Sequence, residues 1–374
     1  MVQALLTRHS SGTRPEAGEP LNFTLCAKCR GAELTGIEMK YGFPLFSKPT
    51  SLVSLGKNEK IVISDIWSFW DYVIKKASKD RKEEDFLRSL LEQAKHFYIT
   101  AEASPVKSQP LLYYYSFLNF SKIIINLSVK HGSRKMYMHG ITEKNNNKFS
   151  HSTITKQKQK ANIVQVAHEL VSIFDPNIST ADVTINVKDL LNHCVGVHRA
   201  YSEIYNQTEV FFRLKNQKLY KNGKELIFKA ELQCVTADIA TLTACGYTIT
   251  QEEESIFYTE KVAMAAYSPT RKDYAALSTV IQAKGIWYFI GDRGYTMYLS
   301  NSATGRYSQE SVIYMSMFYL GSITRYHPYM FDEIFSDKEQ WLMSEFLNTQ
   351  PKQFLYLATA RILGQSVLKA YASF

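Results

Sequence analysis

The chain has 374 residues, a length that suits one large domain or two of ordinary size with an ample hydrophobic core. Hydrophobic residues make up 45% and charged residues 21%, an ordinary balance for a globular protein, while aromatic residues reach 13%. No segment contains the roughly eighteen uninterrupted apolar residues of a membrane span, and the N-terminus lacks the charged-then-apolar order of a signal peptide. We therefore expect a cytoplasmic globular protein that does not engage the membrane.

The positive charge of the chain is unevenly distributed. The formal net charge is +9, and residues 122–160 carry nine basic residues against one acid, Glu143. A localised positive surface attracts phosphate backbones in a sequence-independent, salt-sensitive manner. The alternative is that this stretch is only a solvated, lysine-rich loop. Under the first interpretation the candidate nucleic-acid-binding residues are Lys144, Lys148, Lys156, Lys158 and Lys160.

The five cysteines predict neither a disulfide framework nor a metal site. Cys26 and Cys29 form a C-x-x-C pair, but a zinc site would need a second pair of ligands. His193, Cys194 and His198 fall on an expected helix, where burial in the core is favoured over metal binding. Nucleotide-binding loops and hydrolase motifs are also missing, so we expect no metal and no organic cofactor.

The N-terminal third is predicted to pass from a tail into helices. Residues 1–38 are polar, contain glycine and proline and show no hydrophobic periodicity, so we expect disorder there. Residues 61–76 are predicted to form a strand or turn that leads into a helix. An amphipathic helix is predicted over 80–103, because apolar residues recur every three or four positions and acids crowd its first turns.

The most informative stretch is 111–140, which predicts a long, almost wholly apolar helix that ends near Gly132. It places Arg134 and His139 just beyond its end, in a basic setting. Because two prolines and a short link separate it from the preceding helix, the two helices should pack as an antiparallel pair. The following stretch, 144–160, is predicted to be a loop that contributes nothing to the core.

The middle of the chain changes from helix to strand. Helices are predicted over 163–174 and 188–205, on either side of a strand at 183–187. From 207 to 300, short strand-like runs at 210–214, 219–220 and 226–232 and beyond alternate with polar turns, and Asn222-Gly223 is a strong tight-turn signal. We expect this region to form a small antiparallel sheet inserted within a helical protein.

The C-terminal third returns to helix. Ser308 and Ser311 can cap a helix that stops near Pro328, and two further helices are predicted over 338–348 and 352–371.

These elements together predict an α+β, predominantly helical protein, in which a helical core carries a small antiparallel β-rich insertion. The expected division of the chain is a disordered tail at 1–38, a helical core part at 39–206, the β-rich insertion at 207–300 and helices that pack back on the core at 301–374.

Two segments carry a resemblance to a known family. The first is LLYYYSFLNFSKIIINL at 111–127 followed by MHGI at 138–141, and the second is SVIYMSMFYLGSITRYHPYMFDEIF at 311–335. They are similar to the YaaC-like family of bacterial proteins, with its tyrosine-rich helix, His-Gly turn and later helix ending in an Arg-Tyr pair. The resemblance runs from about Met39 to the C-terminus and implies a family rather than an activity.

The tyrosine-rich helix and the His-Gly turn also resemble, more distantly, HEPN domains, many of which are metal-independent ribonucleases. Arg134 and His139 have four residues between them, a spacing that matches the HEPN catalytic pattern. The resemblance implies that the histidine moves the 2′-hydroxyl proton and that the arginine holds the scissile phosphate. Lys135 departs from the polar residue, such as asparagine or histidine, that usually follows the arginine in HEPN enzymes. In the alternative interpretation, His139 only orders the turn before Gly140 and Arg134 is a surface base.

A second candidate cluster is Arg325, Tyr326 and His327, directly before Pro328. An arginine at the end of a helix can cap free carbonyl groups and favours the negative end of the dipole, so a structural role is the first expectation. If the fold brings Arg325 and His327 beside His139, these side chains would form a composite catalytic site.

Two functions therefore follow from the sequence. The first is a YaaC-like protein that associates with RNA or another nucleic acid, and in its enzymatic form a HEPN-type ribonuclease that acts as a toxin or phage-defence effector. The alternative is a non-enzymatic binding or scaffold protein, whose aromatic helices form a homodimer or hold a protein partner.

Overall fold

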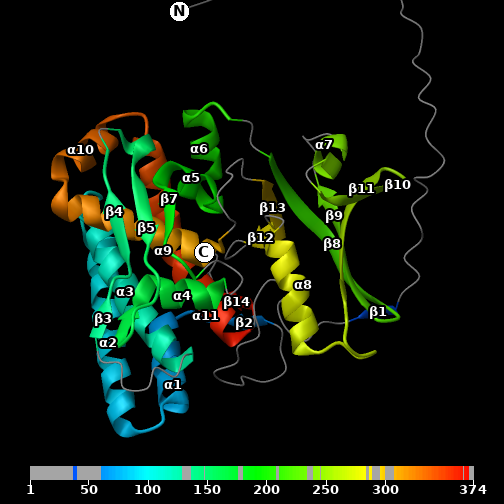
Figure 1. Ribbon diagram of the computed structural model, residues 1–374, viewed down its shortest axis with the longest axis horizontal. Coiled ribbons are helices and arrows are strands. Elements are labelled where there is room, and N and C mark those ends of the chain that lie inside the picture. Colours follow the sequence, from blue (N-terminus) through cyan, green and yellow to red (C-terminus); the bar gives the residue numbers. More distant parts are fainter. Residues whose placement is uncertain are drawn as a thin grey trace, which may run out of the picture. The chain divides into compact units, whose positions relative to one another are not determined.

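Figure 1 shows a computed structural model of the chain. The protein is a mixed α+β fold that is mainly helical and carries an antiparallel β-rich part, which is the predicted fold class. All described residues belong to one compact unit, Leu34–Phe374. The structure describes residues 37–39, 60–128, 136–146, 148–175, 180–207, 210–233, 239–244, 246–283, 286–288, 295–299, 307–364 and 366–369.

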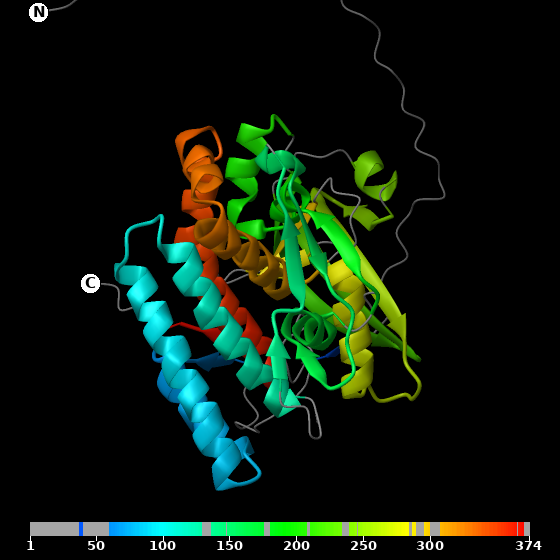
Figure 2. The same ribbon diagram turned by 60° about the vertical axis from the view of Figure 1, so that its left-hand side comes forward.

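Three helices follow the short strand β2 (Lys60–Val62), and each of the first two begins at an aspartate cap. The Asp65 carboxylate accepts the backbone N–H of Trp67 at 3.0 Å, and Asp80 accepts that of Glu83 at 2.8 Å. The last two helices run side by side and antiparallel, as the short link between them predicts (Figure 2). The three helices are α1 (Ile66–Ala77), α2 (Arg81–Ala103) and α3 (Gln109–Ser128).

The helical core is built around α3 and the C-terminal helices. In α9 every side chain from Gln309 to Ile323 is buried, and α3 is buried along most of its circumference. Aromatic rings join these helices, such as the stacked rings of Phe117 and Phe354, whose centroids are 4.1 Å apart. The C-terminal helices are α9 (Gln309–Tyr326), α10 (Pro328–Ser336) and α11 (Gln340–Leu363).

The two helices predicted after residue 338 are a single helix, α11, so this prediction was wrong. Pro351 lies inside α11, where a proline costs about 3 kcal/mol through the lost hydrogen bond and the ring clash. Burial of Leu347 and Phe354 on either side of it offsets that cost, because tertiary packing supplies most helical stability. The helix ends at Gly364, in the left-handed region at φ 64°, and Ser366–Leu368 form strand β14, which pairs in parallel with β2.

The lysine-rich stretch 144–160 is folded and contributes to the core, contrary to the sequence prediction. Ile154 is fully buried and Phe149 is 6% exposed. The stretch contains a strand, Thr153–Lys156, that pairs with neighbours on both sides and buries alternate positions, Ile154 and Lys156. The three antiparallel strands are β4 (Ile141–Lys144), β5 (Thr153–Lys156) and β7 (Val183–Asn186), and the last confirms the predicted strand at 183–187.

The two helices predicted around β7 are both interrupted. The first begins as strand β6 (Ile163–Gln165), which pairs in parallel with β3 (Met136–Met138), before α4 (Val166–Phe174). The second is broken at Gly196, where an added Cβ would lie 1.7 Å from the Gln350 side-chain nitrogen of α11. The backbone therefore approaches α11 so closely at this position that only glycine fits. The broken region consists of α5 (Val187–Asn192), a 3-10 turn (Val195–Val197) and α6 (His198–Ile204).

The β-rich part is a seven-stranded sheet with the order β10-β11-β9-β8-β13-β12 and β1 paired to β8. The predicted turn at Asn222-Gly223 joins β8 to β9, with Gly223 at φ +57°. The runs predicted at 210–214 and 219–220 belong to one strand with an irregularity between Lys215 and Lys218. The strands are β1 (Ile37–Met39), β8 (Val210–Asn222), β9 (Glu225–Gln233), β10 (Thr248–Glu252), β11 (Ser255–Ala263), β12 (Ile286–Tyr288) and β13 (Tyr295–Leu299).

This sheet has a hydrophobic core of its own, which includes Phe212, Phe228 and Tyr258 at 0% exposure. Helix α8 (Arg271–Ala283) packs against it (Figure 1), and α7 (Ile239–Ala244) precedes β10. Residues 37 and 38 belong to β1, although the sequence places them in the disordered tail, and residues 1–36 lie outside the described residues. None of the described helices is long and apolar enough to cross a membrane.

Candidate functional site

The backbone around His139 is fixed from two sides. The carbonyl oxygen of His139 accepts the N–H of Ala167 at 3.0 Å, and that of Gly140 accepts the N–H of Gln157 at 2.9 Å. Gly140 has φ +70°, and an added Cβ there would lie 2.9 Å from the Cβ of Gln165. Only glycine fits this turn without strain. The turn and the two backbone hydrogen bonds together fix the backbone from which the imidazole extends.

Tyr114 of α3 holds the imidazole of His139. Its hydroxyl forms a hydrogen bond with His139 Nδ1, and the two rings are 5.6 Å apart. Tyr114 is 4% exposed and packs edge-on against Phe318 of α9, at 5.4 Å between ring centroids. An added Cβ at Gly321 would lie 2.9 Å from the Tyr114 Cβ, so this glycine lets α3 approach α9 closely. Burial raises the pKa of the Tyr114 phenol well above its ordinary value, so the hydroxyl stays protonated at neutral pH.

The surroundings of His139 favour a neutral imidazole. The residue is exposed as a whole, yet the loss of hydration on its protein side lowers its pKa below the ordinary 6.5. The positive charges of Lys122 and Arg325 lower the pKa further, and the carboxylate of Glu143 acts in the opposite direction. In the described part of the chain, Nε2 has no hydrogen-bond partner. A neutral imidazole with one unoccupied nitrogen can accept or donate a proton near pH 7.

Arg325 reaches this cluster from the end of α9. Its Nη1 donates to the Tyr115 hydroxyl at 2.7 Å, in place of the carbonyl cap predicted from the sequence. Its guanidinium carbon lies 4.9 Å from the centre of the Tyr326 ring. Within the described residues, Arg325 pairs with no carboxylate. The guanidinium is exposed and can therefore bind an anion.

A second cation lies on the other helix of the cluster. Lys122 of α3 is half-buried, and burial lowers the pKa of its ammonium group. Its Nζ donates to Asn119 Oδ1 at 3.3 Å and lies 5.7 Å from the ring centre of Tyr137. Tyr137 in turn accepts a hydrogen bond from Asn126 at 2.6 Å. Lys122 therefore also lacks a carboxylate partner among the described residues.

Among the described residues, Glu143 is the carboxylate whose charge acts on both the His139 imidazole and the Tyr114 phenol. It lies on β4 and accepts the hydroxyl hydrogen of Ser322 at 2.5 Å, which ties β4 to α9. We call the group of side chains that these contacts and charges connect the α3–α9 cluster. Its members are Tyr114, Tyr115, Lys122, His139, Glu143, Ser322 and Arg325.

Of the two candidate catalytic pairs, one member of each, His139 and Arg325, belongs to the α3–α9 cluster. Arg325 lies close enough to His139 to depress its pKa, whereas His327 is exposed and its side chain contacts no described member of the cluster. The backbone N–H of His327 closes α9 by donating to Ile323 O at 2.9 Å. Arg134 lies outside the described residues, so the predicted Arg134–His139 pair stays a prediction.

One of the five lysines predicted to bind nucleic acid is buried. Lys144, Lys148, Lys158 and Lys160 are exposed, but Lys156 is only 1% exposed. The Lys156 ammonium donates to the Ala181 carbonyl at 3.1 Å, and burial lowers its pKa. As a buried lysine on a central strand, it is unavailable to a nucleic acid, so its assignment as a surface contact was wrong.

The sequence interpretation did not assign a role to Tyr114, Tyr115, Glu143 or Ser322, and it counted Lys122 only as part of the basic stretch. The available signal was the run of three tyrosines from residue 113, which on a helix must face in different directions. That run could not identify its partners, because the contact from Tyr115 to Arg325 spans 210 residues.

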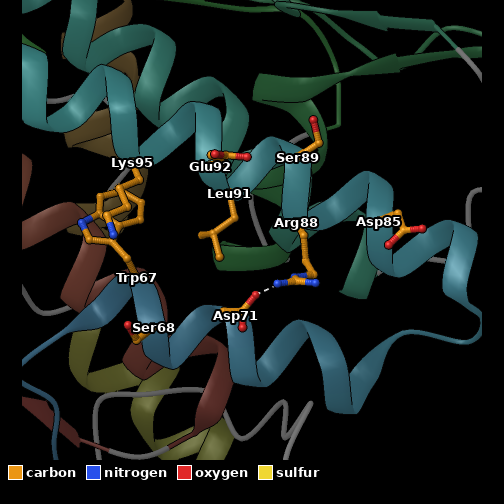
Figure 3. Close-up of a pocket in the computed structure, with 9 residues that line it drawn as sticks. All are labelled: Trp67, Ser68, Asp71, Asp85, Arg88, Ser89, Leu91, Glu92 and Lys95. Atoms are coloured by element: carbon orange, nitrogen blue, oxygen red, sulfur yellow. Dashed lines mark hydrogen bonds and ion pairs between the residues drawn. The ribbon is translucent and has the colours of Figure 1, made fainter.

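Two cavities among the described residues are lined by side chains other than His139. The larger, of about 590 Å³, lies between α1 and α2 and exposes the Arg88–Asp71 ion pair, whose Nε–Oδ1 distance is 2.7 Å (Figure 3). Lys75 and Arg88 lower the pKa of Asp71, as expected for a carboxylate in a surface ion pair. The smaller cavity, of about 240 Å³, lies beside α10 and includes Lys148.

Of the cysteine and histidine candidates for a metal site, His193, Cys194 and His198 lie among the described residues. No group of three His, Cys, Asp or Glu side chains among the described residues could hold a metal ion. Cys194 is fully buried, which raises the pKa of its thiol, and Cys26 and Cys29 lie outside the described residues.

Comparison with known proteins identifies the family. The sequence model described as YaaC-like Protein matches residues 50–362. The chain belongs to the YaaC-like family. The match begins some residues after Met39, where the resemblance was expected to start, and it includes every member of the α3–α9 cluster. Searches of curated proteins and of solved structures returned no match.

Proposed function

We propose that this YaaC-family protein binds RNA at the α3–α9 cluster and cleaves its phosphodiester backbone without a metal ion. The observation that supports it is the contact of Arg325, which carries no carboxylate partner among the described residues and donates to Tyr115, directly after the tyrosine that holds His139. The charge of Arg325 also lowers the pKa of the His139 imidazole. An unpaired guanidinium suits the charge of a phosphate, and a neutral imidazole suits proton transfer at pH 7. Such an activity would fit a toxin or a phage-defence effector.

The proposed reaction is a transesterification within the RNA strand. His139 Nε2 accepts the proton of a 2′-hydroxyl group as the 2′-oxygen attacks the adjacent phosphorus. For Nε2 to act as a base, Nδ1 must carry the hydrogen and donate it to the Tyr114 oxygen. Arg325 and Lys122 balance the negative charge that grows on the phosphate oxygens in the transition state.

The test is cleavage of end-labelled RNA by purified protein in the presence of a chelator. We expect His139→Ala to reduce the rate by about 10²-fold or more, the usual contribution of a positioned acid–base group. Arg325→Gln should reduce it as well, and Arg134→Ala tests the remaining half of the HEPN pattern. Two matched controls change exposed residues of the same types, His151→Ala and Arg81→Gln, and should cleave like the parent.

Equal cleavage by the parent and His139→Ala would contradict the proposal. If the parent cleaves no RNA, the alternative of a binding or scaffold protein is favoured. One observation supports that alternative, namely the strong exposure of Tyr326 at 59% and Tyr329 at 90% where α9 meets α10. A homodimer or a protein partner would cover these rings, and light scattering of the parent and of Tyr329→Ser would then differ.

A further inference from the structure

We propose that Tyr115 donates the proton to the departing 5′-oxygen when His139 initiates RNA cleavage. The inference rests on the proposed ribonuclease function and adds a second proton-transfer group to it. Tyr115 is half-buried on α3, directly after the tyrosine that holds His139. Its oxygen accepts a hydrogen bond from Arg325, the proposed phosphate ligand.

A second group is required because one neutral histidine completes only half of the proton transfer. In the first step the O2′–H proton passes to His139 Nε2, the bond between O2′ and phosphorus forms, and the bond between phosphorus and O5′ breaks. The electron pair of that bond leaves with O5′, and an alkoxide is a poor leaving group in water. Transfer of the Tyr115 phenol proton to O5′ gives a 2′,3′-cyclic phosphate and a free 5′-hydroxyl group, which balances the step.

The contacts of Tyr115 suit it to this role. Because the Arg325 N–H bond occupies the phenol oxygen as an acceptor, the hydroxyl hydrogen is left to point elsewhere, and it donates to no other group in the described part of the chain. The guanidinium also stabilises the negative charge that appears on the oxygen as the proton leaves. Phe97 stacks on the ring at 5.4 Å between centroids and restricts its orientation.

The neighbouring groups suit the role less well. The Tyr114 hydroxyl is engaged with His139, and its raised pKa opposes proton loss. The Tyr137 oxygen accepts a bond from the neutral Asn126 amide and has no cation that donates to it among the described residues. Lys122 is the main rival, since burial lowers the pKa of its ammonium group towards the range of a general acid.

The test compares two substrates with the same sequence. One is ordinary RNA, and the other carries sulfur in place of the bridging 5′-oxygen at a single site. A thiolate leaves without protonation, so loss of the general acid should matter only for the oxygen substrate. We expect Tyr115→Phe to cleave ordinary RNA about 10²-fold more slowly than the parent and to cleave the sulfur substrate at the parent rate. His139→Ala should be slow on both.

Tyr267→Phe is the matched control, because Tyr267 is a 66% exposed tyrosine with a cation, Lys224 Nζ, at 5.4 Å from its ring centre. It should equal the parent on both substrates. A merely structural role for Tyr115 predicts equal losses on both substrates, which would overturn the inference. The inference would also be overturned if the sulfur substrate restored the parent rate to Lys122→Met and not to Tyr115→Phe. Lys122 would then be the proton donor.

The outcomes also separate this inference from the function on which it rests. If the parent cleaves ordinary RNA and Tyr115→Phe cleaves it equally fast, the inference fails and the ribonuclease proposal stands. If the parent cleaves neither substrate, both fail.

Discussion

At the residue scale, the proposed reaction depends on the protonation state of His139. A histidine at a tight turn before glycine is commonplace, and only its neighbours distinguish it. Desolvation, Lys122 and Arg325 all stabilise the neutral form, and Tyr114 fixes one ring nitrogen. In the proposed reaction this side chain therefore acts as a base at pH 7. The positive charges that disfavour its protonation can also bind a phosphate.

This arrangement predicts a measurable pKa. In the folded protein, His139 should titrate below 6.5, and Arg325→Gln should raise its pKa while Glu143→Gln lowers it. Because the folded pKa is below the unfolded value, the contribution of His139 to stability is present above about pH 6.5 and is lost as the pH falls through the folded pKa. Histidine NMR titration with ¹⁵N labelling measures the pKa and identifies the tautomer. A pKa at or above 6.5 in the parent would contradict this account.

At the element scale, the position of α9 determines whether Arg325 reaches the cluster. Its N-terminus is capped by Ser308 and held by Asp175, whose carboxylate accepts the hydroxyls of Ser308 at 2.9 Å and Ser311 at 2.6 Å. In the same turn, Glu310 forms a buried bidentate pair with Arg361 of α11, at 3.0 and 3.3 Å. These polar contacts fix α9 at one end, and the close packing of Gly321 on Tyr114 fixes it near the other.

The buried pair predicts a specific pattern of stabilities. Arg361→Met should lower the free energy of unfolding by about 3–5 kcal/mol, because it leaves the Glu310 charge buried without its partner. Replacing both residues, as Arg361→Met with Glu310→Leu, should recover part of the loss. Chemical denaturation measures both effects. The matched control is Arg88→Met in the exposed Asp71 pair, which should change stability by no more than about 1 kcal/mol. A similar loss in both single variants would refute the role assigned to the buried pair.

At the scale of the whole molecule, the excess positive charge acts through the lysines that reach the surface. Lys158 and Lys160 follow β5 in the connection that hydrogen-bonds to the Gly140 turn, whereas Lys144 and Lys148 lie towards the other end of the β4–β5 pair. RNA that enters the α3–α9 cluster would pass closest to the first two.

We therefore expect Lys158→Gln with Lys160→Gln to weaken binding of single-stranded RNA and to reduce the slope of log K against log salt. The slope should fall by about 0.7 for each phosphate group that the protein no longer neutralises. Lys156→Met is the contrasting variant, since its side chain is buried: it should change stability and leave the salt slope unaltered. Titrations by fluorescence anisotropy at several salt concentrations provide the slopes. A salt slope unchanged by the double substitution would exclude these lysines from the RNA path.

The elements that were predicted well are those whose signal is local. The amphipathic period and acidic first turn of α2, the serine cap of α9 and the glycine turn between β8 and β9 all lie within the elements they define. The predictions that failed needed distant information. Pro351 continues a helix because α11 is buried around it, and Lys156 is buried because β5 pairs with two neighbours.

By itself, the sequence determined the α+β class, the family, the concentration of positive charge and the presence of a histidine at a rigid glycine turn. Only the tertiary structure decided what surrounds that histidine. Tyr114 lies 25 residues away from it along the chain, and Arg325 meets Tyr115 across 210 residues. Such contacts arise from the close packing of α3 against α9, which is set by buried side chains and by Gly321, and no local sequence pattern encodes them.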